Sequence, residues 1–188
     1  MKSGRALKRY GGEVGSKGLI SVEQMPEYFH IINKKIYEDG LFPEQNMPNH
    51  VLLNRYRPGD GIMPHKDGPA YFPYVCILSL NSGIMMNIYE SVDDISARFY
   101  LEPRSLFVFT EKHYTDHFHG IDEEQVDEII DPETMPDDMK HLGINNLALT
   151  AIDQNIVKEK SLQIPRDDER LSLTIRYVPL MKQDQSNE

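Results

Sequence analysis

Between residues 50 and 178 the chain consists mainly of short apolar or alternating segments, separated by Pro, Gly, Asn and Asp. Segments of this length with turn-forming residues between them are typical of strands in a sandwich or barrel. We therefore predict a mainly β fold, most naturally a jelly roll, or double-stranded β-helix. The expected strands are His50–Tyr56, Tyr74–Leu80, Met85–Tyr89, Arg98–Leu101, Ser105–Phe109, Tyr114–Phe118 and Leu171–Val178.

One helical pattern precedes these strands. It begins at Pro26, places Phe29, Ile32 and Ile36 at helical spacing, and ends at Gly40. A single apolar stripe on a polar helix predicts that this N-terminal helix packs against the outside of the sheet and supports it.

The remaining segments are polar. Residues 1–20 are rich in Gly, Lys and Arg, which predicts a flexible cationic lid or arm, or alternatively a frayed terminus. Residues 122–138 hold nine acidic side chains and no Lys or Arg, which predicts a solvated acidic insertion that we extend to residue 169. Within it, Leu147–Ile156 fit either a short helix or a strand. Residues 181–188 resemble a loose polar tail.

Length and charge restrict the function. The 188 residues suit a single domain, and the barrel strands are expected within residues 50–121 and 170–178. A formal net charge of −10 disfavours a protein that wraps long duplex nucleic acid, although a local basic patch is compatible with it. No apolar run is long enough to span a bilayer, so we expect no membrane partner. We also expect a monomer.

The single cysteine, Cys76, excludes an intramolecular disulfide and a Cys-rich zinc site. A chain with one cysteine and no signal-peptide pattern fits an intracellular location, in the cytoplasm or nucleus.

His65-Lys66-Asp67 is the first candidate for chemistry. Residues i and i+2 of an extended chain point to the same side, so His65 and Asp67 can offer an imidazole nitrogen and a carboxylate oxygen to one metal ion. With a second histidine they would form the 2-His-1-carboxylate face that holds iron(II) and leaves three coordination positions open. Taken alone, the pair is more often a surface loop.

Four later histidines, His113, His117, His119 and His141, are candidates for the third ligand. His117 and His119 share one face of a short segment. His119 sits at the end of that segment before Gly120, where a side chain can reach a metal at a barrel mouth. For each histidine by itself, a hydrogen-bonded structural role is the more common one.

The last strand alternates strictly. Leu171, Leu173 and Ile175 share one face, and Arg170, Ser172, Thr174 and Arg176 share the other. In an ordinary half-buried strand the polar face meets solvent. In a barrel with a polar interior the two guanidiniums, with Cα atoms about 20 Å apart, would instead bracket a short dicarboxylate, because arginine grips a carboxylate with two hydrogen bonds.

Four ordered segments together resemble the AlkB-type iron(II)/2-oxoglutarate dioxygenases. They are Asn54-Arg55-Tyr56 with Gly59 and His65-x-Asp67; Leu101-Glu102-Pro103-Arg104-Ser105-Leu106; His119-Gly120-Ile121; and Arg170-x-Ser172-x-Thr174-x-Arg176. Residues 61–65 and 67–69 look closest to the subfamily of AlkB homolog six. The resemblance extends from about Gly4 to Val178 and includes a long insertion before Arg170.

This resemblance implies roles for particular residues. His65, Asp67 and His119 would hold Fe(II), and 2-oxoglutarate and O2 would be the cosubstrates. Asn54, Tyr56, Arg170, Ser172 and Arg176 would bind 2-oxoglutarate, with Ser172 standing where the family often has Asn. Arg5–Gly12 would belong to the substrate lid, shortened here, and three aromatic residues would flank the mouth: Tyr71, Phe72 and Tyr74.

The expected activity is oxidative demethylation of alkylated bases in single-stranded or damaged DNA or RNA, since a base in a duplex must first be flipped out. A second hypothesis is a dioxygenase that hydroxylates or demethylates a protein side chain. A third is a binding module that retains iron and cosubstrate only structurally. The cationic start of the chain favours nucleic acid, whereas the acidic insertion opposes it.

Overall fold

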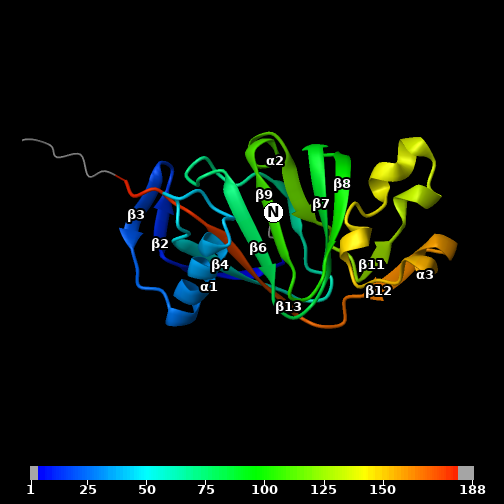
Figure 1. Ribbon diagram of the computed structural model, residues 1–188, viewed down its shortest axis with the longest axis horizontal. Helices are drawn as coiled ribbons and strands as arrows, with labels where there is room; N and C mark the ends of the chain where they lie inside the picture. The colour runs from blue at the N-terminus through cyan, green and yellow to red at the C-terminus, as the bar shows by residue number, and fades with distance from the viewer. Residues whose placement is uncertain (1–3, 182–188) are drawn as a thin grey trace, which may run out of the picture.

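The computed structural model describes residues 4–181, and its centre is two antiparallel sheets packed face to face (Figure 1). The larger sheet has the strand order β1-β4-β13-β6-β9, and the smaller has the order β5-β10-β7-β8. This is the predicted jelly roll. The strands of the larger sheet are β1 (Ala6–Tyr10), β4 (His50–Tyr56), β13 (Arg170–Arg176), β6 (Tyr74–Ser79) and β9 (Leu106–Thr110); those of the smaller are β5 (Ile62–His65), β10 (Phe118–Ile121), β7 (Ile84–Ser91) and β8 (Asp94–Leu101).

Three apolar clusters hold the layers together. Between the sheets, Val75 and Ile77 of the larger sheet pack with Ile84 and Met86 of the smaller one. A second cluster lies between the larger sheet and helix α1 (Glu27–Glu38), and a third lies between the smaller sheet and residues 122–165. Elements therefore pack on the outer faces of both sheets, which explains why the central strands β6 and β7 are apolar on both sides.

Helix α1 confirms the predicted supporting helix. Phe29 and Ile36 are buried against Val51, Cys76 and Ile175 of the larger sheet. A helix with one apolar stripe and a polar remainder can cover a sheet without needing a partner on its other side.

The N-terminal residues differ from the predicted flexible arm. Strand β1 pairs with β4 along its whole length, from Ala6 opposite Arg55 to Tyr10 opposite Val51. Strands β2 (Gly12–Gly15) and β3 (Gly18–Val22) then form a hairpin at one end of the molecule (Figure 1). The composition of residues 1–20 does not reveal this pairing, because β1 is held at the edge of the larger sheet by backbone hydrogen bonds.

Most expected strands are confirmed, but the one predicted at Tyr114–Phe118 is wrong. Helix α2 (Glu111–Thr115) occupies the first part, and β10 begins only at Phe118. Tyr114 and Phe118 are four residues apart, so their spacing suits a helix as well as a strand. Tyr114 is buried, and its hydroxyl donates to the carbonyl of Gly68 at 2.7 Å.

The predicted insertion forms its own small layer at the opposite end from the hairpin (Figure 1). It contains a pair of antiparallel strands and several short helices, so the helical alternative for Leu147–Ile156 is the better one. The acidic run is not wholly solvated as predicted, because Asp127 and Asp131 are buried. The elements are β11 (Val126–Ile129), η1 (Pro132–Thr134), η2 (Asp137–Leu142), η3 (Leu147–Leu149), α3 (Gln154–Glu159) and β12 (Leu162–Pro165).

Within residues 4–181 no helix is long and apolar enough to cross a membrane. The predicted polar tail lies outside the described residues from 182 onward, as does Lys2 of the predicted arm.

A buried ion pair within the insertion contacts the barrel through the carboxylate of Asp127. The carboxylate of Asp127 accepts two hydrogen bonds from Arg166, Nε at 3.0 Å and Nη2 at 2.6 Å, and one from the backbone N–H of Met85. Arg166 also donates to the carbonyl of Asp122. Both charged side chains are almost fully buried, so the ion pair compensates each charge for the water that it has lost.

Replacement of Asp127 by Asn should lower the free energy of unfolding by about 3 kcal/mol, because it leaves the Arg166 charge buried without its counter-charge. Urea denaturation followed by circular dichroism measures this. The control is Lys140→Ala, which removes exposed pairs with Asp137 and Glu133 and should cost less than about 1 kcal/mol. Equal effects for the two variants would contradict the assignment of Asp127 as the attachment point.

Candidate metal and cosubstrate site

The polar face of β13 points into the barrel. Arg170, Ser172, Thr174 and Arg176 all line one cavity between the sheets. The apolar residues of the other face, Leu173 and Ile175 among them, are buried under α1. The expectation of a strand with a polar inward face is therefore confirmed, and the solvent-facing alternative is wrong for this strand.

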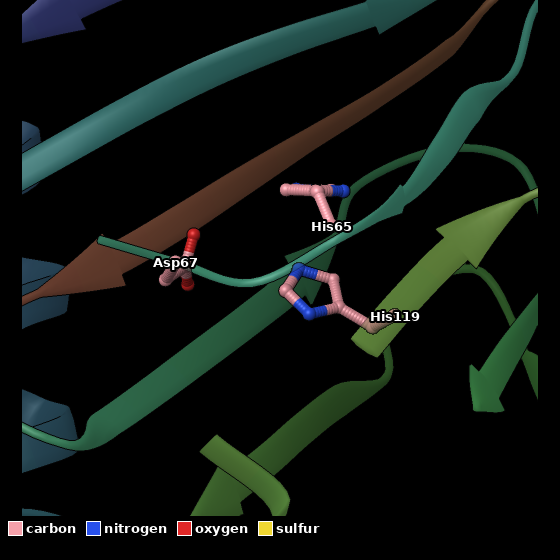
Figure 2. Close-up of side chains that lie close together, drawn as sticks. All are labelled: His65, Asp67 and His119. Atoms are coloured by element: carbon pink, nitrogen blue, oxygen red, sulfur yellow. The ribbon is translucent and has the colours of Figure 1, made fainter. Parts of the chain in front are cut away.

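His65, Asp67 and His119 come together (Figure 2), and the two histidines line this cavity. One ligand atom from each residue can be chosen so that all three lie within 4.8 Å of one another. His65 and His119 are direct cross-strand partners on β5 and β10, with ring centroids 4.3 Å apart. Asp67 follows His65 by two residues, as the sequence motif predicts. In the described part of the chain, these three form the single cluster of this kind.

Two backbone features position the histidines. The Nδ1 of His65 lies 2.9 Å from the carbonyl oxygen of Met63, which can only accept. Nδ1 therefore carries the proton, and Nε2 has a lone pair to offer a metal. After His119, Gly120 lets β10 approach β5 closely, because a Cβ there would lie 2.9 Å from the carbonyl oxygen of Ile62.

Burial keeps both imidazoles neutral. It lowers the pKa of His119 to about 4, with the neighbouring His65 adding to the effect, and it also lowers the pKa of His65. The positive charges of Arg176 and Arg5 act in the same direction on both rings. A metal therefore meets unprotonated histidines at neutral pH, which is the form that coordinates.

Arg176 forms a buried ion pair with Asp67. Its Nε donates to Oδ2 of Asp67 at 3.1 Å and its Nη2 donates to Oδ1, so the fork holds both carboxylate oxygens. The ring of Tyr71 lies beneath the guanidinium, 4.5 Å from Cζ to ring centroid. Arg176 thus lines the cavity and also fixes the orientation of the carboxylate.

Arg170 lies at the other end of β13 and has neutral partners. Its Nη1 donates to the Ser172 hydroxyl and its Nη2 to the Ser79 hydroxyl, each at 2.9 Å. Its Nε is buried without a hydrogen-bond partner. Burial lowers the pKa of this arginine to about 10. A buried cation with an unused donor at a cavity wall is the expected partner of an anion.

Asn54 and Tyr56 reach the cavity from β4. The Nδ2 of Asn54 donates to the Thr174 hydroxyl at 3.0 Å, and its Oδ1 accepts from Nη1 of Arg5 at 3.0 Å. The ring of Tyr56 lies 5.7 Å from Cζ of Arg170. All five residues predicted to bind cosubstrate therefore line the same cavity as His65 and His119.

Other candidates lie elsewhere. His113 and His117 pack against each other at a second cavity, with ring centroids 4.9 Å apart, and His141 is exposed. Phe72 and Tyr74, expected at the mouth, stack on each other and do not line the metal-site cavity. Their aromatic character gave no information about which side of the chain they would face.

Two contributors had no clear sequence signal. Ser79 comes from β6 and contacts Arg170, and a serine within an apolar strand does not indicate a site by itself. Arg5 was expected only as part of a mobile lid, whereas the structure places it in the cavity wall.

Two imidazoles and one carboxylate match the donor set that iron(II) oxygenases use. Ser79, Ser172 and the free Nε of Arg170 suit a carboxylate at the far end of the same cavity. The chemistry of these donors therefore fits a metal ion together with a small dicarboxylate.

Comparison with known proteins agrees with this geometry. Residues 10–176 match the 2OG-Fe(II) oxygenase superfamily. The chain belongs to this family, whose members use iron(II), 2-oxoglutarate and O2, and it is a dioxygenase.

One relative is the zebrafish (Danio rerio) protein named "Probable RNA/DNA demethylase ALKBH6", 30% identical over 189 residues, which cover 94% of this chain and 72% of that protein. Two solved structures share the fold at low identity. OsALKBH1 has a TM-score of 0.51 at 17% identity over 93% of this chain and 78% of its own. An oxidoreductase of the 2OG-Fe(II) oxygenase family from Burkholderia pseudomallei has a TM-score of 0.52 at 13% identity, over 93% and 67%.

His119→Ala should abolish specific Fe(II) binding, because two remaining ligands cannot hold the ion at this face. His117→Ala is the matched control: it lies two residues away on the neighbouring turn, contacts the carbonyl of Lys112, and should bind iron like the wild type. Anaerobic calorimetric titration with Fe(II) measures both. Retained binding in His119→Ala, or equal loss in both variants, would show that the ligand set is wrong.

Proposed function

We propose that this protein is an oxidative demethylase of alkylated bases in single-stranded or damaged nucleic acid. In this proposal His65, Asp67 and His119 hold Fe(II), and Asn54, Tyr56, Arg170, Ser172 and Arg176 bind 2-oxoglutarate. The observation that carries it is Arg170, a buried guanidinium with an unpaired Nε in the wall of the metal-site cavity.

The residues of the site would each perform a physical task. Arg170, aided by Ser172, binds the distal carboxylate of 2-oxoglutarate and so sets the position of the cosubstrate along the cavity. Arg176 keeps the Asp67 carboxylate directed at the metal. Apolar side chains that line the same cavity, such as Ile77 of β6 and Met86 of β7, would exclude water from the reacting atoms.

When bound, the iron, 2-oxoglutarate and O2 would supply the oxidation: 2-oxoglutarate would be converted to succinate and CO2, one oxygen atom of O2 would hydroxylate an N-methyl carbon, and the hydroxymethyl product would lose formaldehyde to give the free base. The protein positions the methyl group and keeps the two imidazoles unprotonated.

Nucleic acid is supported as the substrate by two observations. The zebrafish relative carries the name "Probable RNA/DNA demethylase ALKBH6". In this chain, Arg5 lines the cavity and Arg9 follows on the same face of the segment, which places positive charge on the cavity side of β1 in an otherwise acidic protein. A local basic edge suits a short single strand better than a long duplex. The intracellular location and the monomeric state stay predictions.

Succinate release tests the proposal. A single-stranded oligonucleotide with N-methylated bases should stimulate succinate release above the level seen with the same sequence unmethylated. The amount of formaldehyde formed should equal the additional succinate. Stimulation by protein substrates alone would identify the protein-directed alternative. Absence of turnover with iron and ascorbate present would identify a binding module.

Arg170→Ala should raise the KM for 2-oxoglutarate by a factor of about 30 or more, because truncating one partner of a buried charge pair typically costs 2 kcal/mol or more. Fe(II) affinity should not change, since Arg170 contacts none of the three metal ligands in its hydrogen bonds. Arg55→Ala is the control, as this arginine forms only a long pair, 3.8 Å, with partly exposed Glu169. An unchanged KM in Arg170→Ala would remove the cosubstrate assignment.

A further inference from the structure

Arg5 precedes the first strand of the larger sheet, yet it lines the same cavity as His65, His119, Arg170 and Arg176. The side chain is half-buried, and its Nη1 donates to Oδ1 of Asn54 at 3.0 Å. A third arginine at the same cavity needs a physical reason, because each added guanidinium raises the cost of desolvation.

The contact determines which way the Asn54 amide faces. A guanidinium can only donate, so it must meet the carbonyl oxygen of the amide and not its NH2 group. With Oδ1 held by Arg5, the NH2 group of Asn54 points to the Thr174 hydroxyl at 3.0 Å, on the inner face of β13. Arg5, Asn54 and Thr174 thus form one row of hydrogen bonds across the cavity wall.

The fold fixes where Arg5 enters this row. On one side, β1 is in register with β4, and Leu7 lies opposite Asn54. On the other side, Gly4 packs against the turn between β4 and β5: a Cβ at Gly4 would lie 2.3 Å from Oδ1 of Asp60. The carboxylate of Asp60 is itself held by the backbone N–H of Arg57 at 2.8 Å.

We propose that Arg5 is a positioning residue for the cosubstrate, which orients the Asn54 amide and closes the cavity over bound 2-oxoglutarate. This inference rests on the proposed function, because it assigns the cavity to that dicarboxylate. It also gives the N-terminal segment a second task besides covering the substrate: the segment completes the cosubstrate pocket, so cosubstrate affinity depends on residues far from the β13 arginines in sequence.

Anaerobic titration of 2-oxoglutarate into the Fe(II)-loaded full chain, followed by the visible metal-to-ligand charge-transfer band, tests the proposal. Arg5→Ala should raise the Kd by about tenfold, the loss of one hydrogen bond to a charged group. Fe(II) affinity should not fall, because Arg5 supplies no metal ligand and its positive charge opposes a cation at the two histidines. The kcat at saturating 2-oxoglutarate should change far less than KM. Lys8→Ala, exposed on the same segment with its Nζ over the Tyr10 ring, is the control and should match the wild type.

A double-mutant cycle with Asn54→Ala separates positioning from general stabilisation. If Arg5 acts through Asn54, Arg5→Ala should add little to the Kd in the Asn54→Ala background, and Arg5→Lys should restore part of the affinity. Arg5→Gln serves as the second variant if Arg5→Ala fails to fold. Fully additive effects, or a wild-type Kd in both Arg5→Ala and Arg5→Gln, would overturn the inference while leaving the proposed function intact. A wild-type protein that gives no band would overturn both.

Discussion

The placement of two arginines on the inner face of β13 is the constraint on which the site depends. A guanidinium between two sheets is stable only if the surrounding groups replace the water it has lost. Arg176 meets this requirement within the protein, because Asp67 accepts two of its hydrogen bonds. Arg170 meets it only partly, through two neutral hydroxyls, and retains an unpaired Nε.

This difference between the two arginines organises the cavity. The arginine that is paired internally orients Asp67, which we propose as a metal ligand, and the one that is incompletely paired lies where a carboxylate can bind. The two sheets supply these groups together: β13 and β4 carry the arginines, Asn54 and Tyr56, whereas β5 and β10 carry the histidines. Neither sheet alone contains a complete site, so the packing of the jelly roll is itself a requirement for activity.

Much of this arrangement could be predicted from the sequence because it depends on local periodicity. The alternation in residues 170–176 assigned the inward face of β13, and the spacing of His65 and Asp67 placed both on one side of the chain. The sequence distinguishes His119 from His117 as the third ligand less clearly. The two share a face in an extended chain, but His117 precedes β10 and only His119 pairs with His65.

What could not be predicted depends on contacts between distant residues. The pairing of β1 with β4 carries Arg5 into the cavity, but residues 6–10 have no apolar alternation that would predict a paired strand. The burial of Asp127 follows from the position of Arg166, thirty-nine residues later, and not from the acidic run around it. Tyr114 and Phe118 fitted two periodicities, and the tertiary contacts of Tyr114 decided between them.

The central claim is that one cavity holds both a metal ion and a dicarboxylate. Anaerobic equilibrium dialysis of labelled 2-oxoglutarate against the wild-type protein, with and without Fe(II), tests it most directly. The account predicts stoichiometric binding that is strengthened by the metal and suppressed when the cavity is altered at either end. Binding that is absent, or that is indifferent to the metal, would contradict it.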